Sequence, residues 1–222
     1  MCVIIYKIRQ KINRPNDIRR KGNFASMKIC TLGASVFATN TYLVADEDTN
    51  KAVLIDPDGN GKQIAEFLDK EGFSLEAILL THGHFDHIGA VDALVEIKKV
   101  PVYIHFKDEE LLRDGAKNAS SVFFGGKGIV CNTKPRTVKD TDTLVFGGLR
   151  FVVMETPGHT RGSVCYFAGD AVFTGDTFFA DGYGRTDLYG GSEQMILHSL
   201  RKLVTCMKGK RAYPGHGEPT DV

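Results

Sequence analysis

The sequence lacks the paired cysteines that hold small secreted domains together. Its five cysteines, at positions 2, 30, 131, 165 and 206, are scattered, odd in number and contain no CxxC pair. Such a pattern is typical of reduced thiols rather than of a disulfide framework. We therefore expect a cytoplasmic protein, with organelle targeting as a minor alternative because of the basic N-terminal segment described below.

Long apolar runs are missing as well. No stretch approaches the roughly 18 to 20 apolar residues that a transmembrane helix requires, and the N-terminal apolar run is too short for a secretory signal. We expect no membrane partner. The remaining composition, 42% hydrophobic and 25% charged, is that of a globular protein, and 222 residues can bury a substantial core.

Acidic residues are scarce in one segment only. Residues 1–26 hold seven Lys or Arg against one acid, whereas the rest of the chain holds 21 basic and 26 acidic residues. We interpret residues 1–26 as a basic leader that is disordered or non-essential, and residues 27–222 as a single folded domain. The acidic body argues against a nucleic-acid partner.

From residue 27 onward, apolar runs with strand and helix periodicity alternate. Strands are expected at residues 27–32, 41–46, 51–56, 76–81, 101–105, 143–148, 149–156, 163–169 and 171–176, and near 212. Helices are expected at 61–72, 86–99, about 107–114 and 193–207, with an irregular excursion over 115–135. Two strand-rich halves, each carrying helices, predict two sheets packed face to face with helices outside.

Histidine and aspartate are concentrated in THGHFDHIGA, residues 81–90. Three of the seven histidines and one aspartate stand within six positions: His82, His84, Asp86 and His87. They follow the expected strand EAILLT directly, so they lie where a buried strand ends and a helix begins. Residues i and i+2 of an extended segment point to the same side, which brings His82 and His84 together. Imidazole and carboxylate groups suit zinc, iron or manganese.

Three later motifs carry the same residue types just past expected strands. TPGHT contains His159, FTGDT contains Asp176 and YPGHG contains His216. One tetrahedral ion cannot use all four groups of the short HxHxDH loop, whereas two adjacent ions can, with the later motifs completing their ligands.

We therefore expect two divalent metal ions. The first takes three histidines: His82, His84 and His159. The second takes Asp86, His87 and His216. Asp176 bridges the two ions. The two remaining histidines, His105 and His198, are interpreted as packed or surface side chains.

Two other features are open at this level. Residues 184–187, GRTD, either form a turn held by an Arg–Asp pair or help to shape the site. Four phenylalanines either wall a substrate pocket or pack in the core or a lid, and packing is favoured: Phe123, Phe124, Phe178 and Phe179.

HxHxDH followed in order by TPGHT, FTGDT and PGHG resembles the metallo-β-lactamase superfamily over nearly all of residues 27–216. The resemblance implies the four-layer αββα sandwich of that family. The ligand division is that of the glyoxalase II-like branch, which binds two metals, with zinc preferred and iron or manganese as alternatives. GRTDLYGGS at residues 184–192 looks like the GRTD segment of short, single-domain hydroxyacylglutathione hydrolase-like enzymes.

The expected chemistry is hydrolysis by a hydroxide that bridges two metal ions, whose charge lowers the pKa of the shared water. Asp86 is the expected catalytic residue, because it can orient the hydroxide and accept its proton. No unassigned residue presents itself as a general acid, which favours a thiolate leaving group, since thiols are far more acidic than alcohols or amines. The resemblance implies S-acylglutathione or a related small-molecule thioester as substrate.

The alternatives use the same fold. A persulfide dioxygenase would hold one iron on His82, His159 and Asp176, and a lactonase would use the same hydroxide on an ester. Longer glyoxalase II proteins carry a C-terminal helical domain that helps to hold glutathione, whereas this chain ends six residues after His216. No substrate-binding residue and no oligomeric state is therefore assigned from the sequence.

Overall fold

The computed structural model describes residues 26–32, 36–126 and 128–222. The basic leader expected at residues 1–26 lies outside this part of the chain except for its last residue. The start of the folded domain at Met27 therefore stays a prediction, although the first strand does begin there.

Among the described residues, the first sheet has six strands in the order β1-β2-β3-β4-β5-β6. Their bounds are β1 Met27–Leu32, β2 Thr41–Asp46, β3 Lys51–Ile55, β4 Ser74–Leu79, β5 Val102–His105 and β6 Arg136–Val138. β1, β2 and β3 pair antiparallel, and β3 to β6 run parallel. The helices of this half are α1 Gly61–Lys70, α2 Phe85–Ile88, α3 Val91–Lys98, the 3-10 helix η1 Phe106–Asp108, α4 Glu109–Arg113 and α5 Ser120–Phe124.

In the part of the chain that the structure describes, the second sheet has six strands in the order β12-β11-β10-β9-β8-β7. Their bounds are β7 Thr143–Phe146, β8 Leu149–Glu155, β9 Val164–Ala168, β10 Ala171–Gly175, β11 Arg211–Pro214 and β12 Thr220–Asp221. Within this sheet, β10 and β11 pair parallel, and the other neighbouring strands pair antiparallel. α6, Glu193–Met207, connects β10 and β11 and begins at Ser192, whose side chain accepts a hydrogen bond from the backbone N–H of Met195.

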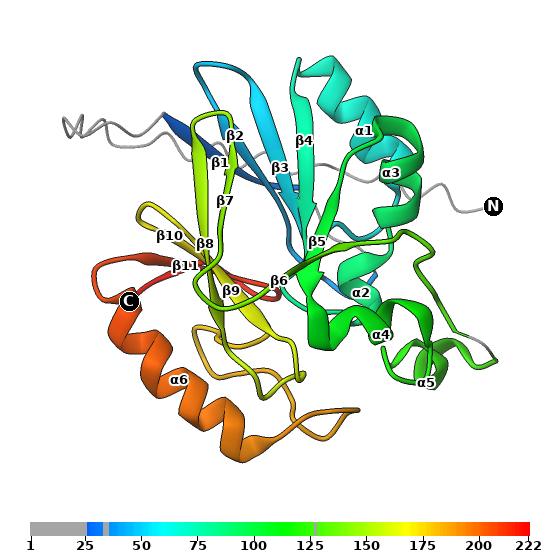
Figure 1. The fold of residues 1–222 in the computed structure, drawn as a ribbon, viewed down its shortest axis with the longest axis vertical. Helices are drawn as coiled ribbons and strands as arrows, with labels where there is room; N and C mark the ends of the chain where they lie inside the picture. The colour runs from blue at the N-terminus through cyan, green and yellow to red at the C-terminus, as the bar shows by residue number, and fades with distance from the viewer. Residues whose placement is uncertain (1–25, 33–35, 127) are drawn as a thin grey trace.

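The described part of the chain forms four layers: helices, the first sheet, the second sheet and α6 (Figure 1). A cluster of buried apolar side chains fills each of the three interfaces between them. Alternate residues of β2 face opposite ways: Leu43 packs beneath α1 and α3, and Val44 packs between the two sheets. On the far side, Val172 of β10 packs against Leu203 of α6. The molecule is therefore an αββα sandwich with the metallo-β-lactamase fold, as the sequence predicted.

Some expected elements differ in detail. The single helix expected over 86–99 is two helices, because the backbone N–H of Ala90 donates to the carbonyl of Pro57 at 3.1 Å instead of continuing the helix. A Cβ on Gly89 would lie 2.1 Å from Asp58 Oδ1, so a larger residue here would displace the Asp58 side chain. The excursion at 115–135 contains α5, and β6 and β12 are too short for a periodic signal.

Among the described residues, no helix is long and apolar enough to cross a membrane.

Candidate metal centre

The seven side chains singled out in the sequence meet at one edge of the sandwich, where strands of both sheets end. β4 leads into the HxHxDH loop, β8 into TPGHT, β10 into Asp176 and β11 into PGHG. Hydrogen bonds join the sheets at this edge: Val164 N–H donates to the Thr81 carbonyl at 2.9 Å, the Tyr166 hydroxyl donates to the Leu80 carbonyl at 3.0 Å, and the Tyr42 hydroxyl donates to the Pro214 carbonyl at 2.6 Å. The fold thus brings together groups that lie up to 134 positions apart in sequence.

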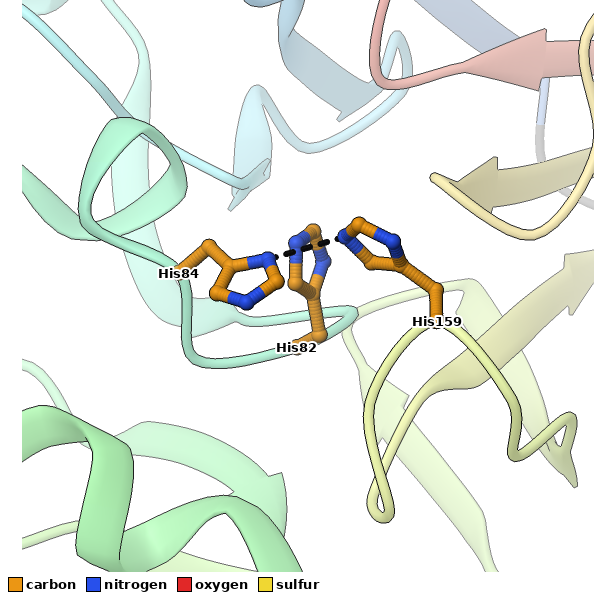
Figure 2. Close-up of side chains that lie close together, drawn as sticks. All are labelled: His82, His84 and His159. Carbon is orange, nitrogen blue, oxygen red and sulfur yellow. Dashed lines mark hydrogen bonds between the residues drawn. The ribbon is translucent and has the colours of Figure 1, made fainter. Parts of the chain in front are cut away.

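The first group contains three buried histidines, His82, His84 and His159, whose rings converge (Figure 2). His84 Nδ1 lies 2.8 Å from His159 Nε2, and the ring of His82 lies 4.9 Å from that of His84 and 4.8 Å from that of His159. Each ring offers one nitrogen that lies within 4.8 Å of the nitrogens offered by the other two. The three imidazoles are thus close enough together to bind one cation between them.

The second group contains Asp86, His87 and His216. Asp86 Oδ2 lies 3.3 Å from His216 Nε2 and 3.8 Å from His87 Nε2. His87 is fully buried, whereas Asp86 and His216 border the cavity described below.

Asp176 stands between the two groups. Its Oδ2 lies 3.5 Å from His159 Nε2 of the first group and 3.5 Å from His216 Nε2 of the second. Its Oδ1 lies 3.5 Å from His87 Nε2. One carboxylate therefore reaches atoms of both groups.

Several polar atoms at the centre are buried without a hydrogen-bond partner. They are His82 Nε2, His84 Nε2, His87 Nε2 and Asp176 Oδ1. Buried polar atoms left unpaired are costly in free energy, so their concentration at one point calls for a ligand that bonds to nitrogen and oxygen together. Divalent cations such as zinc or iron match this donor set.

The electrostatics differ between the two groups. Burial holds the pKa values of His82 and His84 well below the usual value, and neighbouring imidazoles act in the same direction. Neutral imidazole is the form that ligates a metal. Burial also opposes a charge on His87, but Asp86 and Asp176 outweigh it and raise the pKa of His87 to about 10. The carboxylate side of the centre thus attracts positive charge.

Asp56 is a residue of the centre that the sequence reasoning missed. It is buried after β3, and its Oδ2 accepts from His87 Nδ1 at 3.0 Å and from the Thr81 hydroxyl at 2.6 Å. With Nδ1 held in this way, Nε2 of His87 faces the centre. The sequence did contain a signal, because Asp56 is the last residue of the expected strand KAVLID, and the other ligand-type residues also lie at strand ends.

Asp108 and Thr39 were also missed. Asp108, fully buried, accepts from Gly83 N–H at 3.1 Å, from the Thr160 hydroxyl at 2.7 Å and from Gly162 N–H at 2.7 Å. It therefore ties the HxHxDH loop to the TPGHT loop of the other half. The Thr39 hydroxyl donates to Asp86 Oδ2 at 3.1 Å. No local sequence pattern marks either residue.

Of the other residues considered in the sequence, the two remaining histidines lie away from the centre, whereas the GRTD segment contacts it. His105 is buried away from the centre, with Nε2 2.8 Å from Glu155 Oε1, and His198 is exposed on α6. Arg185 of GRTD makes two bonds to Asp187, at 2.6 and 2.7 Å, as the turn interpretation predicts. Its carbonyl also holds His159 Nδ1 at 2.7 Å, so the segment helps to shape the site as well.

A cavity of about 300 Å³ opens beside the centre. Five of the proposed ligands border it: His84, Asp86, His159, Asp176 and His216. Phe123 and Phe179 line the cavity, as the pocket-wall interpretation of these residues predicts, although core or lid packing was favoured for them. Phe178 instead packs against the core beneath α6. The remaining lining is mostly apolar: Phe37, Phe85, Ala119, Tyr183, Gly184, Arg185 and Leu188.

The family model of the metallo-beta-lactamase superfamily matches residues 34–216. The chain belongs to this superfamily. A relative from Bacillus subtilis (strain 168), "Probable metallo-hydrolase YqgX", is 38% identical over 188 residues, which cover 82% of this chain and 87% of the relative. "Probable polyketide biosynthesis zinc-dependent hydrolase BaeB" of Bacillus velezensis (strain DSM 23117 / BGSC 10A6 / LMG 26770 / FZB42) is 30% identical over 79% of this chain and 71% of its own length.

Solved structures of this superfamily superpose closely on the chain. BLEG-1 B3 metallo-beta-lactamase is 36% identical with a TM-score of 0.80, covering 88% of this chain and 93% of its own. TTHA1623 in a di-iron-bound form is 34% identical with a TM-score of 0.76, and the match covers 86% of this chain and 93% of the TTHA1623 chain. ETHE1 from Myxococcus xanthus is 31% identical with a TM-score of 0.71, and the match covers 87% of this chain and 79% of the ETHE1 chain. These similarities span several branches and do not single out the glyoxalase II branch.

Proposed function

We propose that this chain is a binuclear metallo-hydrolase that cleaves thioesters in the manner of glyoxalase II. The observation that carries the proposal is the position of Asp176, whose carboxylate lies 3.5 Å from a ligand-type nitrogen of each group. Two relatives support the hydrolase part, because they are described as a probable metallo-hydrolase and a zinc-dependent hydrolase. A similar structure with two irons supports a two-ion centre.

The residues that would hold the ions come from two of the three clusters of ligand-type atoms among the described residues; the third cluster, Asp56, His82 and His87, shares its histidines with the other two. His82, His84 and His159 would hold one, and Asp86, His87 and His216 would hold the other, with Asp176 shared. Two such ions, when bound, supply a water of lowered pKa and polarise a carbonyl oxygen.

Asp86 is the proposed proton acceptor. Its Oδ2 is engaged by the Thr39 hydroxyl at 3.1 Å and lies close to His216 Nε2, so Oδ1 is the atom that would orient the attacking water and receive its proton. Asp86 borders the cavity, where a substrate carbonyl would enter.

The cavity offers little help to a poor leaving group. Outside the proposed ligands, the polar side chains among its described lining are Tyr183 and Arg185. Arg185 is held by Asp187, which raises the pKa of the guanidinium further, so it cannot donate a proton. A thiolate departs without assistance, whereas an alkoxide does not, which favours thioesters over esters and lactones.

The second candidate function is persulfide dioxygenation on a single iron. That arrangement would use His82, His159 and Asp176 and leave His84 outside the ligand set. His84 Nδ1, however, lies 2.8 Å from His159 Nε2, inside the first group. This proximity favours a three-histidine site over the ligand set of the single-iron arrangement.

Turnover separates the two candidates. The zinc- or iron-loaded chain is assayed with a thioester, with the oxygen ester of the same acyl group, and for persulfide-dependent oxygen uptake. The proposal predicts clear hydrolysis of the thioester, slower hydrolysis of the ester and no oxygen uptake. Tyr183→Phe, which removes the one side-chain hydroxyl in the described lining, should keep the thioester activity. Oxygen uptake without thioester hydrolysis would refute the proposal.

A further inference from the structure

We propose that the cavity beside the metal centre binds the apolar acyl group of its substrate against an aromatic wall, defined as Phe37, Phe85 and Phe123. The inference rests on the proposed thioesterase function and narrows its substrate class. Saturated acyl groups of several carbons are preferred over short hydroxyacyl groups such as lactoyl.

The wall begins at the centre itself. Phe85 stands between the proposed ligands His84 and Asp86, and all three wall residues line the cavity. The ring centroids are separated by 4.8 Å for Phe37 and Phe85, 5.2 Å for Phe85 and Phe123, and 5.5 Å for Phe37 and Phe123. These separations are those of packed aromatic rings, so the wall is a continuous apolar surface.

Part of this aromatic surface is open to solvent. Phe123 of the wall is 54% exposed. Phe124, which is not part of the cavity lining but whose ring lies 5.7 Å from that of Phe85, is 55% exposed. Aromatic rings that stay half exposed around a cavity offer surface that a ligand can bury. The wall adjoins the reacting centre and so suits the acyl chain, which is attached directly to the carbonyl carbon, whereas the carbon chain of the thiol is one sulfur atom further away.

Buried polar bonds hold the wall in place. The backbone N–H of Phe85 donates to the carbonyl of Asn118 at 3.2 Å, which couples the ligand loop to the turn before α5. The Ser120 hydroxyl donates to Asn118 Oδ1 at 2.7 Å, and Asn118 Nδ2 donates to the Ile129 carbonyl at 2.9 Å. Asn118 and Ser120 are fully buried. A surface fixed before binding loses little conformational freedom when it receives a ligand.

The chemistry of the wall disfavours a hydroxyl on an acyl group that lies against it. The three wall side chains have no hydrogen-bonding atom. Tyr183 and Arg185, the polar side chains of the described lining outside the proposed ligands, are not part of the wall, and Arg185 bonds Asp187 through Nε and Nη2. A hydroxyl placed against the wall would lose its hydration without gaining a partner, whereas a methyl group would not.

A chain-length series tests the wall. N-acetylcysteamine thioesters from acetyl to octanoyl are hydrolysed by the zinc-loaded chain, and kcat/KM is measured for each. We expect kcat/KM to rise about threefold for each added methylene until the wall is covered. Phe123→Ala should flatten this rise, mainly through KM. The matched control is Val122→Ala, a neighbouring residue that is 74% exposed and lies outside the described cavity lining, and it should keep the wild-type slope.

A pair of substrates of equal size tests the hydroxyl. Lactoyl and 2-methylpropanoyl thioesters differ by one hydroxyl in place of one methyl group. The wall predicts that the 2-methylpropanoyl thioester is hydrolysed at least as efficiently. A preference of more than about tenfold for lactoyl, or a flat chain-length series, would overturn the inference while leaving the thioesterase proposal intact.

Binding of products separates the inference from the proposed function. Octanoate and lactate are titrated calorimetrically into the zinc-loaded chain and its Phe123→Ala variant. Tighter binding of octanoate that is abolished in the variant supports the acyl site even if no thioester is hydrolysed, in which case the thioesterase proposal alone fails. Equal binding of the two acids to the unaltered chain would overturn the acyl site.

Discussion

At the scale of single residues, several imidazoles of the centre use one ring nitrogen to fix the direction of the other. His87 Nδ1 is held by Asp56 at 3.0 Å, and His159 Nδ1 by the carbonyl of Arg185 at 2.7 Å. Such outer partners set the tautomer of a histidine and its readiness to bind a metal. The residue types of HxHxDH predicted the chemistry of the centre, but these partners come from distant segments and were missed.

Asp56→Asn tests the support behind His87. The amide keeps the size of the side chain but removes the charge that Thr81 and His87 face. We expect the affinity of the second ion to fall by about 10- to 100-fold, because such partners contribute that much to metal binding. Competition with a chelator measures it. Asp69→Asn on α1, whose side chain is 70% exposed, is the control and should bind metal normally.

Asp176→Ala tests the shared ligand. Its carboxylate reaches both groups, so its removal should lower the occupancy of both ions, whereas His216→Ala should mainly empty the second. Metal analysis of the purified variants gives the number of ions per chain. A full complement of two ions in the Asp176 variant would show that this residue does not bridge.

At the scale of elements, the ends of the strands determine where the ligand-type residues lie. The sequence predicted most strands to within one or two residues, since apolar runs bounded by turn residues mark them clearly. It did not predict the break at Ala90, which depends on the distant carbonyl of Pro57, or α5, which lies in a Gly- and Ser-containing segment. Nor did it indicate that η1 carries Asp108, which joins the two ligand loops.

Asp108→Ala tests the connection that Asp108 makes between the HxHxDH and TPGHT loops. Removing the carboxylate leaves Gly83 N–H, Gly162 N–H and the Thr160 hydroxyl without this acceptor, so the metal-free chain should lose about 2 to 4 kcal/mol of unfolding free energy. Zinc affinity should also fall, because both ligand loops lose their common anchor.

Leu203→Ala is the matched comparison for Asp108→Ala. Leu203 is fully buried beneath α6, so its truncation should cost about 2 to 5 kcal/mol by leaving a cavity. Its zinc affinity should stay unchanged. Denaturant unfolding and zinc titration measure both quantities. Equal zinc affinity in the two variants would contradict the role given to Asp108.

At the scale of the whole molecule, the sandwich forms the centre by joining two sheets at the edge where their strands end. Neither sheet holds a full ligand set, since β4 supplies the HxHxDH loop and β8, β10 and β11 supply the rest. The layered fold followed from the sequence because buried strands and amphipathic helices alternate. The aromatic wall did not, since it depends on how the segments around Phe37 and α5 pack against the ligand loop.

A chain that begins at Met27 should keep the fold, zinc affinity and activity. β1 starts at this residue, and the shortening removes two hydrogen bonds within the described residues: Glu47 N–H to the Ser26 carbonyl, and the Ser26 hydroxyl to the Glu47 carboxylate. Each such bond contributes about 1 kcal/mol. Circular dichroism, zinc titration and the thioester assay compare the shortened and full chains. Loss of activity on shortening would give residues 1–26 a role that their sequence does not indicate.

The central claim is that two ions act together in thioester hydrolysis. It is tested by adding zinc stepwise to the metal-free chain and measuring bound metal and thioester hydrolysis in the same samples. If both ions are required, activity rises to its plateau only as the second equivalent binds. Full activity at one equivalent, or a chain that saturates with a single ion, would contradict the claim.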